Sequence, residues 1–306
     1  MRDSFIRAYC GECFIKTAMR FLNEGTNDGK KIFKGLKRTL EILNDEFTEN
    51  AYTFIIGNKL AREINKVLED DTLDIFKDVK RRSNELCMSM YPDLEQKYDL
   101  LDDLDSKLEF VKTASVAGNI IDVGTPGHEF KLDSSEMFNI MDEIKEEGFI
   151  INDTDKLKDL ILDPGVKKFL IMLDNAGEIV FDKFLLKLLK ENEKSLTCMV
   201  RGKPIANDAT LDDASLVGIT EICDEVLETS IASLGYTIPD NEQDVIEKVN
   251  NMDVIIGKGQ ANLETLSIYA DEIEAGHIFV LSRIKCETVA EFMGVKIGDN
   301  MLKKVK

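Results

Sequence analysis

The chain has 306 residues, of which 43% are hydrophobic, and a formal net charge of -19 at pH 7. This length and composition allow a sizeable core in one large domain or two lobes, and the negative charge argues against nonspecific nucleic-acid binding because it would repel a phosphate backbone. No apolar run approaches the roughly 20 residues that a membrane span needs, and the N-terminus lacks the apolar core of a signal peptide, so we expect no membrane insertion and a cytoplasmic location.

The first part of the chain, residues 1–115, is expected to form a helical lobe. It is rich in Leu, Ile, Glu, Lys and Asp, and its apolar residues have the spacing of helices at 60–68 and 100–111. Its first 112 residues contain a single proline, Pro92. This composition favours helices over strands throughout the lobe.

The N-terminal segment also contains a pair of cysteines. Cys10 and Cys13 are three residues apart in a stretch with helical apolar spacing, so their sulfurs would share one helix face and could bind a soft metal. Cys286, after the last predicted strand, could be a third ligand of this possible second metal site. Alternatively, the cysteines serve as small apolar residues in a helix interface.

From residue 116 to residue 306 the pattern changes to an α/β core. Short apolar runs alternate with amphipathic stretches, which predicts parallel βαβ construction. The predicted strands are 169–173, 196–200, 254–256 and 278–281, and the predicted helices include 182–189, 242–249 and 287–293. Because no linker separates the two parts, we expect the helical lobe and the core to pack together.

Polar side chains stand where the first of these strands ends. Asp174 and Asn175 follow the apolar run directly, and Gly177 and Glu178 complete the motif before a predicted helix. In open parallel sheets, ligands bind at the carboxyl ends of the strands. This motif is therefore the first place to look for a functional site.

Three further polar clusters occur at predicted strand ends or loops. Asp208, preceded by Asn207, follows the second strand, and Lys258 stands between Gly257 and Gly259 after the third. The remaining cluster, Asn119 with Asp122, lies at the seam between the lobe and the core.

Together these residue types suggest metal-assisted phosphate chemistry. Two carboxylates and a carboxamide from neighbouring strand ends would form a hard oxygen site suited to Mg²⁺ or Mn²⁺. Glycines beside Lys258 would let backbone N–H groups approach an anion, and the lysine adds a positive charge. A cation at such a site can polarise a phosphoryl group and orient an attacking water.

Each cluster taken alone also has a structural explanation. Asn175 with Glu178 fits a helix N-cap and capping box, and Asp208 could cap the next helix. Lys258 could lie in a solvated turn, and Asn119 could hold a loop through side-chain hydrogen bonds.

In combination, the motifs resemble a known family. Asp-Asn-Ala-Gly-Glu at 174–178, Lys-Pro-Ile-Ala-Asn-Asp-Ala-Thr at 203–210, Gly-Lys-Gly-Gln-Ala-Asn-Leu-Glu at 257–264 and Gly-Asn-Ile-Ile-Asp at 118–122 occur in order. They are similar to the damage-control phosphatases, long catalogued as domain of unknown function eighty-nine, which include the acidic-residue-methyltransferase-like proteins. The paired N-terminal cysteines with a later cysteine resemble those of the prokaryotic branch.

The resemblance implies a fold, an activity and a set of roles. The fold is a three-layer α/β/α sandwich with a mostly parallel sheet and an N-terminal helical lobe. The activity is metal-dependent hydrolysis of small phosphorylated metabolites, such as sugar phosphates or damaged cofactor intermediates. Asp174, Asn175 and Asp208 would bind the divalent cation, which could be Mg, Mn, Co or Ni, and Lys258 would hold the substrate phosphate.

Substrate-binding roles are expected for further residues of the four motifs. Asn119 and Asp122 could hydrogen-bond substrate hydroxyls, and Glu178, Gly257 and Gly259 are also predicted to line the substrate site. The sequence predicts no oligomeric state.

The reaction we expect proceeds without a covalent intermediate. The cation binds the phosphate and a water, and the water displaces the alcohol in line. Asp174 directly follows its strand, as a haloacid-dehalogenase nucleophile does, but Ala176 replaces the second Asp of that class. We therefore interpret Asp174 as a metal ligand.

One motif departs from the family pattern. The family usually has Gly-Gln-Gly-Asn followed by an aromatic residue, whereas this chain has Gln260-Ala-Asn-Leu263. Since Ala261 has less backbone freedom than glycine, the loop geometry and substrate choice could differ here.

Two other functional classes stay open. An S-adenosylmethionine-dependent carboxyl methyltransferase is suggested by the family's naming history, although the sequence offers no Gly-rich loop after a first strand with an acidic residue closing the next. A non-catalytic phosphometabolite-binding module could use the 257–259 loop as an anion-binding site.

Overall fold

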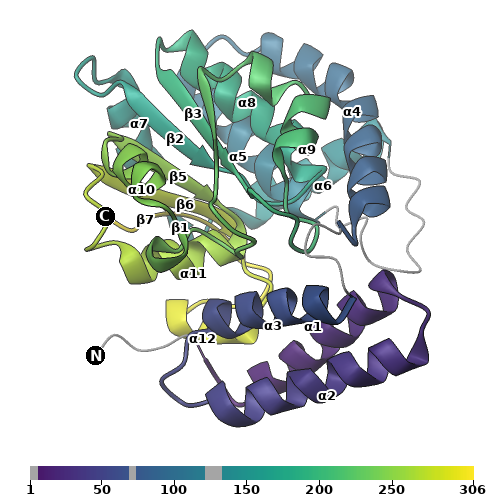
Figure 1. Cartoon of the computed structure of the whole chain (residues 1–306). Helices are drawn as coiled ribbons and strands as arrows, with labels where there is room; N and C mark the ends of the chain where they lie inside the picture. The colour runs from purple at the N-terminus through teal and green to yellow at the C-terminus, as the bar shows by residue number, and fades with distance from the viewer. Residues whose placement is uncertain (1–5, 69–73, 121–132) are drawn as a thin grey trace.

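Seven strands form one sheet at the centre of the molecule (Figure 1). The structure is a computed structural model, and it describes residues 6–68, 74–120 and 133–306. The strand order is β1-β7-β6-β5-β2-β3-β4, and every neighbouring pair is parallel except β6 with β7. The strands are β1 (Ile151–Asn152), β2 (Lys168–Met172), β3 (Ser195–Val200), β4 (Glu225–Glu228), β5 (Val254–Lys258), β6 (His277–Arg283) and β7 (Asn300–Lys304).

Helices cover both faces of this sheet. On one face lie α4 (Lys77–Asp99), α5 (Leu104–Ile120), α6 (Ser134–Glu147), α7 (Thr154–Leu162), α8 (Glu178–Glu191) and α9 (Leu211–Leu216). On the other lie α10 (Gln243–Asn250), α11 (Gly259–Tyr269) and α12 (Glu287–Met293). The predicted three-layer α/β/α sandwich with a mostly parallel sheet is confirmed.

The alternation of side chains along β2 shows how these layers are held. Phe169 and Ile171 pack into the core on the α8 face, whereas Leu170 and Met172 pack into the core on the α11 face. Successive strand residues point to opposite faces, so a strand covered on both sides is apolar throughout. This is why residues 169–173 read as an uninterrupted apolar run.

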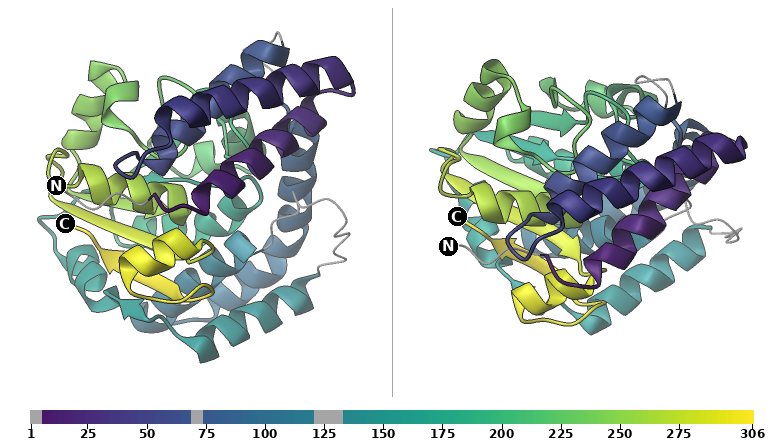
Figure 2. Two further views of the ribbon diagram at one scale, coloured as in Figure 1. Left: turned by 90° about the horizontal axis from the view of Figure 1, so that it is seen from below. Right: turned by 60° about the horizontal axis from the view of Figure 1, so that its bottom comes forward.

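The first three helices form a separate layer below the sandwich (Figures 1 and 2). They are α1 (Cys10–Gly25), α2 (Gly29–Glu46) and α3 (Thr53–Leu68). Seen from below in the left view of Figure 2, they lie in front of the sandwich, with α1 and α2 alongside each other. This layer is the helical lobe of the structure.

The helical lobe is predicted to extend to residue 115, and two helices of this predicted lobe, α4 and α5, pack on the sheet. α4 and α5 share the sheet-face core with α8, through residues such as Met90 and Val111. The helix predicted at 100–111 is displaced as well, since α4 ends at Asp99 and α5 begins at Leu104. Whether residue 115 is a domain boundary stays a prediction. None of the described helices is long and apolar enough to cross a membrane.

Candidate metal and phosphate site

The carboxyl ends of three neighbouring strands carry the predicted motifs. β2 lies between β5 and β3 in the sheet, and all three run parallel. Their ends therefore lie at one edge, with Asp174 after β2, Lys258 at the end of β5 and the 201–210 segment after β3. This is the position at which open α/β sheets bind ligands.

Backbone hydrogen bonds join the segments that follow β2 and β3. The amide of Ala209 donates to the carbonyl of Asp174 at 2.8 Å, and the amide of Ala176 donates to the carbonyl of Asn207 at 2.9 Å. Between them, Asn175 and Asp208 form an antiparallel bridge. The three predicted metal ligands, Asp174, Asn175 and Asp208, are thus side by side although 34 residues separate the two aspartates in sequence.

This cluster is buried and strongly acidic. Asp174 and Asp208 are 7% and 4% exposed. Burial raises the pKa of Asp174 well above that of an ordinary aspartate, and the charges of Glu178 and Asp208 raise it further. Burial also raises the pKa of Asp208, against the opposing effect of Arg201. A bound cation would strongly stabilise the ionised form of carboxylates in such surroundings.

The donor set fits a hard divalent cation. Asn175 Nδ2 donates to Asp174 Oδ2 at 3.0 Å, which leaves the amide oxygen of Asn175 without a hydrogen bond from the part of the chain described. Two carboxylates and this oxygen are the ligand types that Mg²⁺ and Mn²⁺ prefer. Among the described residues no group of three His, Cys, Asp or Glu side chains is arranged for a metal.

Gly259 brings α11 against the carboxylate of Asp174. Its φ of +75° is in the left-handed region, and a Cβ there would lie 1.8 Å from Asp174 Oδ2. Gly257 has a different role: a Cβ there would lie 2.5 Å from Leu266 Cδ1, so this glycine allows α11 to pack on β5. Of the two predicted substrate-site glycines, Gly259 lies at the site and Gly257 beneath it.

Lys258 lies inside the protein and forms two ion pairs. Its Nζ is 2.8 Å from Glu178 Oε1 and 2.6 Å from Asp182 Oδ1, and the residue is 1% exposed. Burial acts to lower the pKa of Lys258, but the two carboxylates outweigh burial and the pKa is raised. Lys258 is therefore a charged, internal residue, and the alternative of a solvated turn is wrong. These ion pairs use two of the three donors of its ammonium group.

Glu178 connects this ion pair to the metal-ligand cluster. Its Oε2 accepts hydrogen bonds from Asn119 Nδ2 at 2.6 Å and from Asn175 Nδ2 at 3.4 Å. Burial acts to raise the pKa of Glu178, but Lys258 and Asn119 outweigh it and the pKa is lowered, so Glu178 is ionised. Asn119 is therefore an α5 residue that holds Glu178, rather than a loop residue, and Asp122 lies outside the described residues.

The helix-cap explanations for these residues are wrong. Gly177 is the N-cap of α8, and no side chain caps that helix. The N-cap of α9 is Thr210, whose N and Oγ1 donate to Asp213 Oδ2 at 3.0 and 2.8 Å. Neither the half-buried Asn175 nor the buried Asp208 is used as a cap.

Comparison with known proteins identifies the family. Residues 6–301 match the model of the damage-control phosphatase ARMT1-like domain. The chain belongs to this family. The resemblance of the four motifs is thereby confirmed over nearly the whole chain, whereas the cysteine pair is not confirmed as a family feature.

Several archaeal members of the family are similar along their whole length. An uncharacterized protein of Methanocaldococcus jannaschii is 32% identical, covering 98% of this chain and 95% of that protein. A damage-control phosphatase of Archaeoglobus fulgidus is 29% identical, with 98% and 99% covered. The crystal structure of a DUF89 family protein from Pyrococcus horikoshii superimposes with a TM-score of 0.85 at 26% identity, covering 98% of this chain and 99% of that one.

Two basic residues beside the candidate site were not predicted from the sequence. Arg201 Nε donates to Asp208 Oδ2 at 2.7 Å, and the residue is 1% exposed. Lys285 is exposed, its Nζ donates to the carbonyl of Asn119 at 2.6 Å, and its charge lowers the pKa of Asp174. Both follow strands closely, Arg201 directly after β3 and Lys285 two residues after β6, and this position was the signal that could have identified them.

The three cysteines predicted to bind a second metal are not assembled as a metal site. The sulfur of Cys10 is 3.0 Å from Thr288 Oγ1 and accepts the amide of Arg7 at 3.4 Å. Cys10 is buried, Cys13 is exposed and Cys286 is half-buried. Burial raises the pKa of the Cys13 thiol. Binding of a second metal there stays a prediction.

Proposed function

We propose that this damage-control phosphatase homologue is a divalent-metal-dependent phosphomonoesterase that acts on small phosphorylated metabolites in the cytoplasm. The observation that carries the proposal is the pairing of the 174–176 and 207–209 segments. It brings Asp174, Asn175 and Asp208 together at the carboxyl edge of the sheet, where two buried carboxylates lie beside the half-buried amide of Asn175.

The cation would be Mg, Mn, Co or Ni and would be held by Asp174, Asn175 and Asp208. When bound, such a cation polarises the phosphoryl group and activates a water. The protein's own residues keep the ligands in place. Arg201 fixes one oxygen of Asp208, and Asn175 Nδ2 fixes one oxygen of Asp174. Oriented ligands of this kind bind a metal more tightly than free side chains do.

Positive charge for the phosphate comes, in this proposal, from Lys285 rather than from Lys258. Lys285 is exposed, its Nζ donates to the carbonyl of Asn119, and its charge acts against the burial that raises the pKa of Asp174. An ammonium there neutralises charge on the phosphoryl oxygens as an in-line water displaces the alcohol. Lys258 has an indirect, positioning role. Its ion pair keeps Glu178 ionised, and Glu178 in turn orients Asn119 and Asn175.

Asp174 is unsuited to act as a nucleophile in this arrangement. Its Oδ2 is hydrogen-bonded to Asn175, and its carboxylate abuts the backbone of Gly259. We therefore propose direct attack by water and no phosphoenzyme.

The test is a phosphate-release assay on the purified protein after treatment with a chelator. Sugar phosphates, nucleotides and pantetheine phosphates are offered with and without Mg²⁺, Mn²⁺, Co²⁺ and Ni²⁺. Asp208→Asn, which keeps the shape of the side chain, should abolish metal-dependent release, whereas Asp212→Asn, an exposed neighbour on α9, should retain it. Binding of phosphate esters without release by the wild type under any metal would show a binding module instead.

A further inference from the structure

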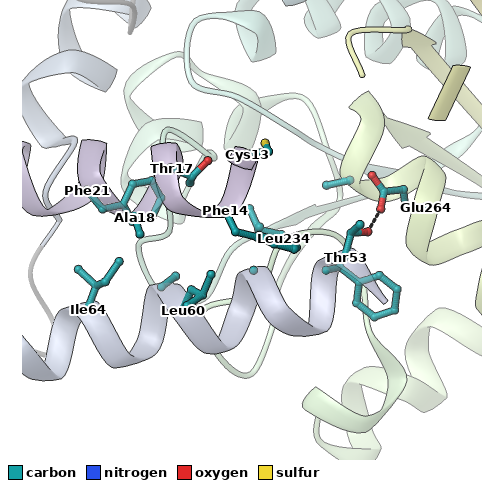
Figure 3. Close-up of a pocket in the computed structure, with 14 residues that line it drawn as sticks. Cys13, Phe14, Thr17, Ala18, Phe21, Thr53, Leu60, Ile64, Leu234 and Glu264 are labelled. Carbon is teal, nitrogen blue, oxygen red and sulfur yellow. Dashed lines mark hydrogen bonds between the residues drawn. The ribbon is translucent and has the colours of Figure 1, made fainter. Parts of the chain in front are cut away.

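A cavity lies in the helical lobe, between α1 and α3, and α11 closes it at one end. Its volume is about 190 Å³. Figure 3 shows Phe14 and Ala18 of α1 facing Leu60 and Ile64 of α3 across it. Native cores contain few voids larger than a water molecule, so a space of this size is unusual for packing alone.

Small residues on the facing helices create this space. Ala18 on α1, Gly57 and Ala61 on α3, and Ala261 on α11 all line it. Gly57 and Ala61 are one turn apart and so lie on one face of α3. A dry cavity of about 150 Å³ lined by Leu, Ile and Phe can hold benzene. The cavity here therefore has room for a body of about six to eight carbon atoms.

One carboxyl group faces this otherwise apolar space. Glu264 of α11 lines the end near α3 and accepts a hydrogen bond from Thr53 Oγ1, shown by the dashed line in Figure 3. Gln260, one turn earlier on α11, also hydrogen-bonds to it. Both partners are neutral, and within the described residues no ion pair joins Glu264 to a Lys, Arg or His. The carboxylate is thus left without a countercharge.

The rim of the cavity is open to solvent along α1. Cys13 and Thr17 line it and are both exposed. The same cavity is lined by these two exposed residues and by Glu264.

We propose that this cavity binds a small primary amine, with the ammonium on Glu264 and an apolar body of about six to eight carbon atoms between α1 and α3. An ammonium supplies three donors and the missing positive charge. The apolar body covers the walls formed by Phe14, Leu60 and Ile64. A ligand with a carboxylate would be repelled by Glu264 and by the protein's net charge of -19.

The experiment compares three probes with the same apolar body: 2-phenylethylamine, 2-phenylethanol and phenylacetate. Binding is measured by titration calorimetry on the full chain in excess chelator, so the result does not depend on phosphatase activity. The amine should bind, the alcohol should bind at least about tenfold more weakly, since it lacks a charge-assisted hydrogen bond, and phenylacetate should not bind. Equal binding of all three, or none by the amine, would overturn the proposal.

Variants locate the bound amine. Glu264→Gln should weaken amine binding by at least about tenfold and leave the alcohol nearly unchanged, whereas Glu272→Gln, an exposed carboxylate beyond the end of α11, should change neither. Ala61→Phe fills the cavity and should abolish binding of both. Because Ala61 is buried, Thr17→Trp provides a second block at the exposed rim. Undiminished amine binding in both folded blocking variants would place the amine elsewhere and reject the proposal.

Discussion

The Cα of Gly259 faces the carboxylate of Asp174 so closely that a Cβ on it would lie 1.8 Å from Oδ2. The contact joins the first residue of α11 to the second residue after β2, across two neighbouring strands. Because the glycine also has a φ of +75°, no other residue fits this position without displacing the carboxylate.

Gly259→Ala should therefore remove metal binding and phosphate release together. The methyl group must push Asp174 away from Asn175 and Asp208, which breaks the proposed ligand set. Metal titration by calorimetry and the phosphate-release assay measure the two effects. Gly29→Ala is the matched control, because a Cβ at Gly29 meets nothing within 4 Å. If Gly259→Ala bound metal as the wild type does, Asp174 would not be a ligand.

Lys258→Met should lower the free energy of unfolding of the protein. It removes the cation from between Glu178 and Asp182, which are 2% and 0% exposed. Breaking a buried ion pair by removing one partner costs about 3–5 kcal/mol of unfolding free energy. Urea denaturation measures this loss. A variant that kept wild-type stability and lost only activity would show that Lys258 contacts the substrate.

Lys285→Met should lower activity and leave the stability of the protein nearly unchanged. Lys285 is exposed, so its removal should change the free energy of unfolding by less than about 0.5 kcal/mol. Loss of one group that stabilises transition-state charge should lower kcat/KM for a phosphate ester by about 100-fold. Unchanged kinetics would assign the phosphate contact to another residue. Together with Lys258→Met, this variant separates the roles of the two lysines.

The strand ends that carry the site were predictable from the sequence, but their pairing was not. Strands covered on both faces read as apolar runs, so 169–173 predicted β2 (Lys168–Met172) almost to the residue. The hydrogen bond from Ala209 to Asp174 joins loops 35 residues apart in sequence, and no local pattern specifies it. The convergence of the two aspartates was inferred from the resemblance to the family.

The orientation of Lys258 shows a different limit. A lysine between glycines at a strand end suggests an exposed loop. Here, however, the carboxylates that surround Lys258 come from α8. Glu178 and Asp182 are four residues apart on α8, so they share one helix face, and both are buried. Two acidic residues on the buried side of an apolar helix were a signal for an internal cation, and this signal could have placed Lys258 correctly.

Glu264 should make the stability of the protein depend on pH. Burial raises the pKa of Glu264 from 4.5 to about 7, although Thr53 and Gln260 act to lower it. From α1, Cys13 is the titratable group nearby, and its raised pKa keeps it neutral in this range. The folded state binds the Glu264 proton more tightly than the unfolded state, so this stabilisation is complete below pH 4.5 and is lost as pH rises through 7.

Glu264→Gln, which does not titrate, should therefore gain stability relative to the wild type between pH 5 and pH 8. One pKa unit corresponds to about 1.4 kcal/mol, so the relative gain should be on the order of 2–3 kcal/mol. Urea denaturation of both proteins at the two pH values gives the difference directly. Glu272→Gln should show no such trend, because its carboxylate is exposed. The stability difference between Glu264→Gln and the wild type could instead stay constant with pH. Glu264 would then ionise as an ordinary surface carboxylate does. In that case the cavity would lack the buried, uncompensated charge on which amine binding depends.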